Sequence, residues 1–377
     1  MKPKTSVYIH IPFCRSKCVY CDFASFADID HLMGPYLEAL LIEIGHEHPL
    51  DVNTVYLGGG TPSHLPVESM ERIMAAVKAK FHIDSDAEMT IEVNPRSATP
   101  DTLKSYRQMG FNRLSIGVQS FDDAMLKRLG RVHSAQDARD TVVDARNAGF
   151  NNLSIDLIHG IPGQSLEMAM DDLAAAVSLS PEHLSVYQLT VEEDTPLWDL
   201  VEDGKLELPE DGLQLSMYES AIGYLKGKGF AHYEVSNFAK PGNECLHNLA
   251  YWVGDEFLGL GSGAHSFIES VRYANPEDPE HYIRDVAIGG TAAVEIHADE
   301  PDKIIDYFLM RLRLVDKSLD FETVNRKFGI NFSEKYEKAL KTLERQGLIR
   351  VSKSGFTQTH KGLLFLDDVL LELDKVC

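Results

Sequence analysis

The feature that most constrains the fold is an alternation of short apolar runs with longer helix-patterned segments, from Val7 to about Leu189. The runs are rich in β-branched and aromatic residues and almost continuously apolar, which is typical of strands buried on both faces of a sheet. The pattern predicts strands at residues 7–11, 54–59, 88–93, 113–119, 152–157 and 184–189. It predicts helices between them at residues 34–48, 66–81, 99–109, 134–148 and 165–179.

Repeated strand–helix–strand units with right-handed crossovers form a parallel sheet. Six units are too few to close an eight-stranded barrel, so we predict an α/β fold, an open (β/α)6 partial TIM barrel. Chemistry in such folds collects at the carboxyl ends of the strands. Ser134 and Asp137 predict a capping box at the start of the fourth helix, and Gly110 and Gly149 predict left-handed helix ends.

The alternation ends near Pro209. A helix is expected at 211–228, followed by short strands and site-facing loops that include residues 231–239, 245–254 and the glycine-rich 257–267. The last segment contains "GLGSGAH" but follows no Rossmann strand–helix unit, so we interpret it as a loop near the site rather than a nucleotide-binding motif.

From Pro301 the pattern is helical, with a hairpin around Ser354 and Gly355 before a final helix. This order resembles a winged helix. We therefore expect a (β/α)6 core at 1–210, a core extension at 211–300, and a mainly helical, winged-helix-like module at 301–377.

Charge and cysteine content restrict the partners and the compartment. The chain has 36 Lys and Arg against 58 Asp and Glu, a formal charge of −22, which argues against nucleic acid or an anionic membrane as a partner. Three of the five cysteines lie within eight positions, so a disulfide framework is not expected and a reducing, cytoplasmic setting is favoured. Cys245 and Cys377 are expected to be free thiols.

Cys14, Cys18 and Cys21 follow the first predicted strand with the spacing C-x3-C-x2-C. A structural zinc site is one alternative, but it needs four ligands, and no second pair of Cys or His occurs at a matching spacing. A [4Fe–4S] cube also takes four cysteines, so three would leave one iron open to a reactant. The spacing therefore favours substrate chemistry over simple electron storage.

This spacing after a first strand resembles the signature of radical S-adenosylmethionine (radical SAM) enzymes. The resemblance implies that Cys14, Cys18 and Cys21 hold a [4Fe–4S] cluster whose open iron binds the amino and carboxylate groups of SAM. The segments "YLGGGTP", "IEVNP", "GVQSF", "LGRVHS" and "IDLIHGIPGQ" place polar residues at or beyond successive strand ends. By the resemblance, the residues that bind one or two SAM molecules are Tyr8, Tyr20, Gly59, Gly60, Thr61, Glu92, Gln119, Arg131 and Asp156.

The same segments, with "YIHIPFC", resemble one branch end to end: the oxygen-independent coproporphyrinogen III oxidases and the HemW-like haem chaperones. The oxidases carry a fourth cysteine where this sequence has Phe23, and a long N-terminal arm where only 13 residues precede Cys14. "HNLAYW" (247–252) matches the haem motif of the chaperones, H-N-x-x-Y-W. The resemblance implies that His247 is an axial ligand of the haem iron and that Tyr251 and Trp252 pack against the porphyrin.

We therefore expect a haem chaperone on a radical SAM scaffold, which binds a [4Fe–4S] cluster, SAM and haem and delivers haem to haem proteins, possibly membrane-bound respiratory enzymes. One alternative is oxygen-independent coproporphyrinogen III oxidase, acting by radical oxidative decarboxylation. The other is a radical SAM methyltransferase of the same branch. The sequence leaves open whether the chain is an enzyme that cleaves SAM, which protein donates electrons, and whether it forms a homodimer.

Overall fold

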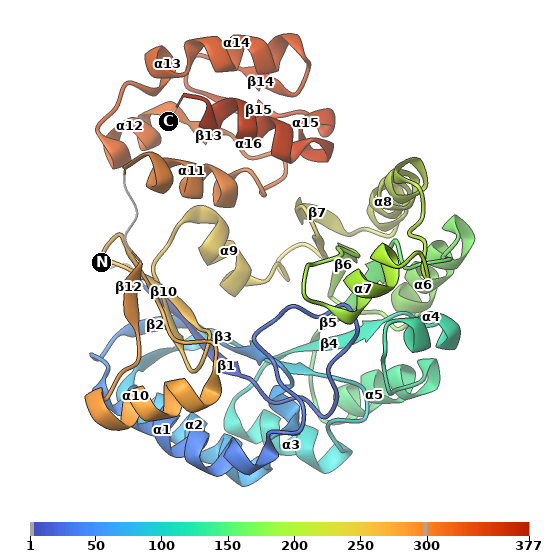
Figure 1. The fold of residues 1–377 in the computed structure, drawn as a ribbon, viewed down its shortest axis with the longest axis vertical. Helices are drawn as coiled ribbons and strands as arrows, with labels where there is room; N and C mark the ends of the chain where they lie inside the picture. The colour runs from blue at the N-terminus through green and yellow to red at the C-terminus, as the bar shows by residue number, and fades with distance from the viewer. Residues whose placement is uncertain (1–3, 297–299, 377) are drawn as a thin grey trace.

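The structure is a computed structural model that describes residues 4–296 and 300–376. Figure 1 shows an α/β body with a helical C-terminal module beside it. Within the described residues the body contains one 12-stranded sheet. Its order is β12 (Val294–Ile296), β11 (Val271–Ala274), β10 (His265–Ile268), β9 (Phe257–Leu260), β1 (Thr5–Ile11), β2 (Asp51–Gly59), β3 (His82–Val93), β4 (Arg113–Gln119), β5 (Asn152–His159), β6 (His183–Gln188), β8 (Asn237–Ala239) and β7 (Ala231–Glu234).

The six predicted strands are confirmed as the parallel centre of this sheet, from β1 to β6. One more parallel strand, β9, pairs with β1 between Ser6 and Ile9. It comes from the glycine-rich segment 257–267, far along the chain, so the repeating strand–helix pattern did not reveal it. Antiparallel strands continue the sheet beyond β9 and beyond β6.

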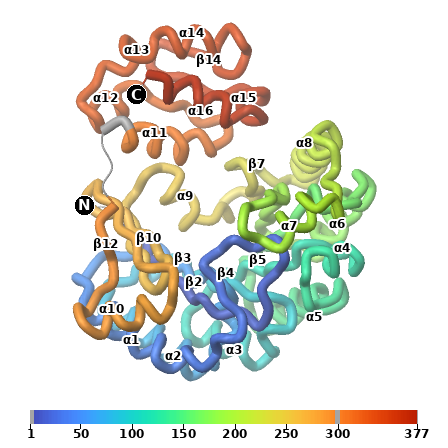
Figure 2. The backbone as a smooth tube through the Cα atoms, in the orientation of Figure 1, coloured from blue at the N-terminus to red at the C-terminus, as the bar shows by residue number. Residues whose placement is uncertain are grey.

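The predicted helices of the repeating units are also present, and they cover the outer face of the sheet (Figure 2). They are α1 (Met33–His46), α2 (Val67–Lys80), α3 (Pro100–Met109), α5 (Ala135–Asn147) and α6 (Leu166–Ser178). The capping box of Ser134 and Asp137 is confirmed, and Gly110 and Gly149 adopt φ angles of 105° and 92°. The sequence pattern missed two 3-10 turns, η1 (Asp30–Leu32) and η2 (Pro62–His64), and a short helix, α4 (Asp123–Arg128).

The prediction of strands and loops for residues 245–254 is wrong, because this segment forms helix α9 (Leu246–Val253). The carboxylate of Glu88 on β3 accepts hydrogen bonds from the backbone N–H groups of Leu246 (3.2 Å) and His247 (3.1 Å). A negative charge there satisfies the free amides of the first helical turn and favours the helix dipole. The stabilising residue lies more than 150 positions away, so local sequence did not show it.

The predicted helix at 211–228 is confirmed as α8 (Asp211–Gly227). It follows the short helix α7 (Pro196–Glu202). Farther along the chain, α10 (Pro279–Gly289) packs on α1. The C-terminal module contains α11 (Glu300–Arg311), α12 (Phe321–Phe328), α13 (Phe332–Lys335), α14 (Glu337–Arg345), α15 (His360–Leu364) and α16 (Leu366–Asp374). Its strands are β13 (Leu319–Asp320), β14 (Ile349–Val351) and β15 (Gly355–Gln358).

The predicted hairpin around Ser354 and Gly355 is confirmed by antiparallel pairing of β14 with β15. Phe308, Phe332 and Val369 belong to a hydrophobic core that the module has of its own. The domain boundaries at 210 and 300 stay predictions. None of the helices in the described ranges is long and apolar enough to cross a membrane.

Candidate functional site

A cavity of about 330 Å³, here called the cysteine cavity, opens at the carboxyl ends of the parallel strands. All three predicted cluster ligands line it, together with every predicted SAM residue except Tyr8. These lining residues are Cys14, Cys18, Cys21, Tyr20, Gly59, Gly60, Thr61, Glu92, Gln119, Arg131 and Asp156. The structure thus gathers side chains from four successive strand ends and the cysteine loop around one space.

The cysteine loop is held against the end of β2 through backbone contacts. The N–H of Gly60 donates to the carbonyl of Ile11 (2.8 Å), and the N–H of Thr61 donates to the carbonyl of Phe13 (2.9 Å). A Cβ atom on Gly60 would lie 2.8 Å from the Phe13 carbonyl oxygen and 3.0 Å from the Cys14 Sγ. Only glycine therefore allows the loop to approach this closely.

The three half-buried cysteines suit a cluster better than a single ion. Arg131 Nη1 donates a hydrogen bond to the Cys18 Sγ (3.4 Å), and burial raises the pKa of Cys14. In residues 4–296 and 300–376, no three His, Cys, Asp or Glu side chains converge closely enough for one metal ion. In a four-iron cube each cysteine binds a different iron, so the three thiols can lie farther apart than the ligands of a single ion.

Arg131 connects the cysteine loop to two strand ends through a residue that the sequence analysis missed. Its Nη2 donates to the Oδ1 of Asn94 (2.5 Å) and to the carbonyl of Gly117 (2.5 Å). Asn94 in turn donates to the Thr61 Oγ1 (2.9 Å). Its place directly after the third strand, in "IEVNP", was the available signal.

The acidic residues of the cysteine cavity are partly buried and hydrogen-bonded. Tyr56 donates to Glu92 (2.8 Å), and burial raises the pKa of Glu92 to about 7. Ser115 donates to Asp156 (3.0 Å), whose pKa burial also raises. Gln119 has a φ of 69°, in the left-handed region, beside a bulge that redirects the end of β4. Such acceptors can hold the hydroxyl and ammonium groups of a ligand the size of SAM.

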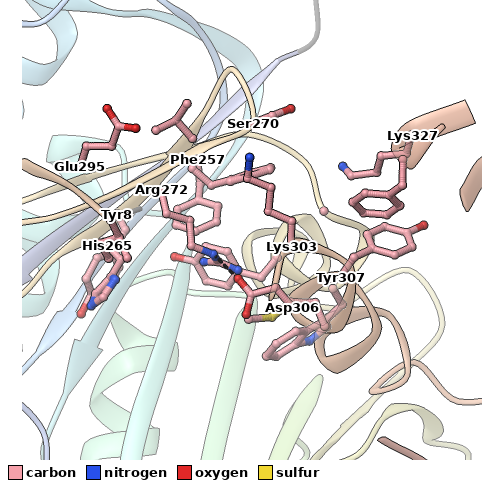
Figure 3. A pocket seen from close by; sticks show the side chains of 18 of the residues that line it. Tyr8, Phe257, His265, Ser270, Arg272, Glu295, Lys303, Asp306, Tyr307 and Lys327 are labelled. Carbon is pink, nitrogen blue, oxygen red and sulfur yellow. Dashed lines mark hydrogen bonds and ion pairs between the residues drawn. The ribbon is translucent and has the colours of Figure 1, made fainter. Parts of the chain in front are cut away.

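A second cavity of about 740 Å³, here called the aromatic cavity, lies between the β9–β12 edge of the sheet, α9, and helices α11 and α12 (Figure 3). Tyr8, predicted beside SAM, lines this cavity instead, and its hydroxyl lies 3.0 Å from the His10 Nδ1. The other aromatic and titratable residues that line it include Tyr251, Trp252, Phe257, His265, Phe267, Arg272, Glu295, Lys303, Asp306, Tyr307, Lys327 and Phe328.

Cationic side chains accompany these aromatic walls (Figure 3). Arg272 donates to the Asp306 carboxylate (2.6 Å). The Nζ of Lys327 lies 5.6 Å from the ring centre of Phe267 and 5.3 Å from that of Tyr307. The aromatic cavity can therefore take a flat apolar ligand that carries negative groups.

The structure separates the three residues predicted to bind haem. Tyr251 and Trp252 line the aromatic cavity, whereas His247 is 1% exposed and lies behind Tyr251. Its Nδ1 is 2.7 Å from the Thr54 Oγ1, and its Nε2 is 2.8 Å from the Tyr251 hydroxyl. Burial and, second, the charge of Arg113 lower the pKa of His247 to about 3, so the imidazole is neutral. Ligation of haem iron by His247 stays a prediction.

Cys245, at the start of the same segment, is a free and fully buried thiol, as predicted, and Cys377 lies outside the described residues. Burial raises the pKa of Cys245 to about 12, which makes it a poor metal ligand or nucleophile. His265, to which no role was assigned from sequence, lines the aromatic cavity from the start of β10.

Comparison with known proteins identifies the family of the chain. Residues 8–176 match the Radical SAM superfamily, and residues 299–365 match the HemN C-terminal domain. The chain is 36% identical to the heme chaperone HemW of Bacillus subtilis, over 97% of each chain. It is 37% identical to the heme chaperone HemW of Escherichia coli, over 83% of this chain and 84% of that protein. The chain belongs to the HemW family.

The solved structure of the coproporphyrinogen III oxidase HemN from Escherichia coli, described as a radical SAM enzyme, is 27% identical to this HemW-family chain. Its TM-score is 0.87, and the match covers 100% of this chain and 91% of HemN. Radical SAM membership implies a [4Fe–4S] cluster and SAM. The three cysteines on the loop of this HemW-family member fit such a cluster. Phe23, which is 65% exposed, also lines the cysteine cavity and supplies no fourth thiol there.

Proposed function

We propose that this chain is a haem chaperone that carries haem in the aromatic cavity. The observation that carries the proposal is that the "HNLAYW" helix presents Tyr251 and Trp252 to a cavity of about 740 Å³, which is inside the range of ~300–1,000 Å³ for small-molecule sites. Aromatic faces can pack a porphyrin, and the cations Arg272, Lys303 and Lys327 complement its two propionates.

In this proposal the cysteine cavity holds the [4Fe–4S] cluster and SAM. Cys14, Cys18 and Cys21 would hold the cluster, and SAM would bind to it beside the strand ends. Such a cluster, when reduced, supplies one electron to the sulfonium of SAM. Glu92 and Asp156 accept hydrogen bonds from the ligand, while Arg131 holds the cysteine loop against Asn94. The haem acceptors would be haem proteins, including those of the respiratory chain.

The overall similarity to HemN favours a second candidate function, the oxidative decarboxylation of coproporphyrinogen III. Two features support carriage instead. The relatives that share 36–37% identity over most of the chain carry the name heme chaperone. The position occupied by Phe23 holds no thiol beside the cluster loop.

One anaerobic experiment tests both candidates. The purified chain is reconstituted with iron and sulfide and given SAM and a chemical reductant. One portion is loaded with haem and mixed with a haem-free acceptor protein, and another is mixed with coproporphyrinogen III. Haem transfer, 5′-deoxyadenosine and vinyl products from coproporphyrinogen III are then measured together. We expect transfer of haem and no vinyl product. Vinyl product without haem transfer would establish the oxidase function, and neither activity would overturn both.

A further inference from the structure

The positive charges that line the aromatic cavity are not spread evenly around it. The lining residues with a guanidinium or ammonium group are Arg272 on β11, Lys303 on α11 and Lys327 on α12. We propose, on the basis of the proposed haem-carrying function, that this cavity selects porphyrins whose carboxylates stand along one edge of the ring, and that Arg272 anchors that edge. The cavity takes haem and rejects an iron coproporphyrin, which carries a carboxylate on every pyrrole.

Arg272 is the best placed of the three cations to hold a carboxylate. It is half-buried, whereas Lys303 and Lys327 are exposed. Its Nε donates to the Asp306 carboxylate (2.6 Å), and its guanidinium carbon lies 5.6 Å from the centre of the Phe267 ring. The contact with Asp306 uses only the Nε, so the Nη1 and Nη2 nitrogens can still bind a carboxylate through two parallel hydrogen bonds.

The other end of the aromatic cavity has no cation. Tyr8 on β1 and His265 at the start of β10 lie together there, apart from Lys327 (Figure 3). In the part of the chain that the structure describes, no Arg or Lys from β1, β9 or β10 lines the cavity. Burial and, second, the charge of Arg272 lower the pKa of His265, so its imidazole is neutral.

Acidic side chains make this end still less suitable for a carboxylate. Burial and, second, the charge of Glu92 raise the pKa of Tyr8, which places a carboxylate close to this phenol. Glu295 on β12 lines the aromatic cavity and also lies apart from Lys327 (Figure 3). A carboxylate that entered this end would lose hydration without meeting a cation, which costs free energy. A ligand with all its carboxylates on one edge avoids that cost by turning the edge toward Arg272.

Haem has the required distribution of charge. Its two propionates stand on neighbouring pyrroles, and the opposite edge carries only vinyl and methyl groups. Phe257 and Tyr251, which also line the cavity, offer apolar contacts to the rest of the ring. Iron coproporphyrin III has a propionate on each of its four pyrroles, so two propionates point away from Arg272 in every orientation.

The test is a titration of the full-length protein with three ferric porphyrins: haem, haem dimethyl ester and iron coproporphyrin III. Absorption spectra measure each affinity. We expect haem to bind about tenfold or more tightly than either of the others. All three ligands contain the same iron, so ligation of the metal by a protein side chain does not by itself produce this order.

Three variants test the residues behind the selectivity. Arg272→Gln should weaken haem binding about tenfold and leave the affinity for the dimethyl ester unchanged, because the ester has no carboxylate to anchor. Arg284→Gln is the matched control, since Arg284 is exposed on α10 and does not line the cavity, and it should change neither affinity. His265→Lys adds a cation at the Tyr8 end and should reduce the ratio of the haem and iron coproporphyrin III affinities several-fold.

The outcomes separate this proposal from the proposed function. Equal affinities for haem and iron coproporphyrin III would overturn the selectivity while leaving haem carriage intact. An unchanged haem affinity in Arg272→Gln, or an unchanged ratio in His265→Lys, would overturn the assignment of the two ends. If the wild type binds no haem, the proposed function itself fails. SAM binding by each variant, measured in parallel, shows that the fold is retained.

Discussion

The two cavities are built in contrasting ways. The cysteine cavity is polar, and its walls come from consecutive strand ends between β1 and β6 and from one loop. The aromatic cavity is lined by segments far apart in the sequence: β1, the stretch from α9 to β12, and helices of the C-terminal module (Figure 1). The difference shows that one cavity can be lined mainly by residues that follow a local sequence pattern, while the other is assembled only when distant elements pack.

The two cavities are nevertheless connected by a chain of contacting side chains. Glu92 lines the cysteine cavity and accepts a hydrogen bond from Tyr56 (2.8 Å). The Tyr56 ring stacks on His247, and His247 contacts Tyr251, which lines the aromatic cavity. A change at one cavity that alters binding at the other would show coupling through these contacts.

The largest expected effect is loss of the cluster in Cys18→Ser. Serine oxygen replaces a thiolate poorly, so most of the ~four irons per chain should be lost. Haem affinity should stay within about twofold of wild type if the cavities are independent. Iron and sulfide analysis with a haem titration measures both. Cys245→Ser is the matched control for iron content, because Cys245 lies outside the cysteine cavity. Loss of haem binding in Cys18→Ser would show coupling.

Trp252→Ala should weaken haem binding strongly while leaving SAM binding unchanged. Removal of one large aromatic face costs about 2–3 kcal/mol, which is roughly 30- to 150-fold in affinity. Fluorescence or absorption titration measures it. Trp198 on α7 is the only other tryptophan in the sequence, and it lines neither cavity, so Trp198→Ala provides the control. Equal losses in the two variants would contradict haem binding in the aromatic cavity.

The pKa of Glu92, about 7, makes SAM affinity depend on pH. The carboxylate forms as pH rises, and SAM is cationic, so affinity should increase by up to about tenfold from pH 6 to pH 8. Calorimetry at several pH values measures this change. Glu92→Gln should remove the dependence, whereas the exposed Glu68→Gln on α2 should keep it.

The same shift has a consequence for stability. The pKa of Glu92 is about 7 in the folded chain and near 4.5 in the unfolded chain. Between these pH values the unfolded chain binds fewer protons than the folded chain, so the free energy of unfolding falls as pH rises. Glu92 therefore costs stability at pH 8, and Glu92→Gln should raise the melting temperature of the ligand-free protein there. A lower melting temperature at pH 8 would contradict the assigned pKa.

The smallest expected effect is at the exposed cation Lys327. Lys327→Gln should weaken haem binding about two- to fivefold, with a smaller difference at high salt, because a rim charge is screened by solvent. Lys341→Gln, on α14 and paired with Glu337, is the control and should not change affinity. A salt-independent loss would indicate packing rather than a propionate contact.

Much of the cysteine cavity could be predicted because its determinants are close in sequence. The spacing of Cys14, Cys18 and Cys21 places three thiols on one loop, and parallel strands bring their carboxyl ends to one edge. Asn94 was missed although it follows a predicted strand, because nothing local distinguishes a residue that bridges Arg131 and Thr61 from a solvated strand end.

The sequence by itself determined the repeating strand–helix order, the cysteine loop and the polar strand ends, since periodicity and spacing are local properties. Only the tertiary structure decided that residues 246–253 form a helix, because Glu88 on a distant strand satisfies its first amides. It also decided which face of that helix meets the aromatic cavity. The motif predicts that its histidine, His247, contacts haem. In the structure His247 is buried against Thr54 and Tyr56, whereas Tyr251 lines the cavity.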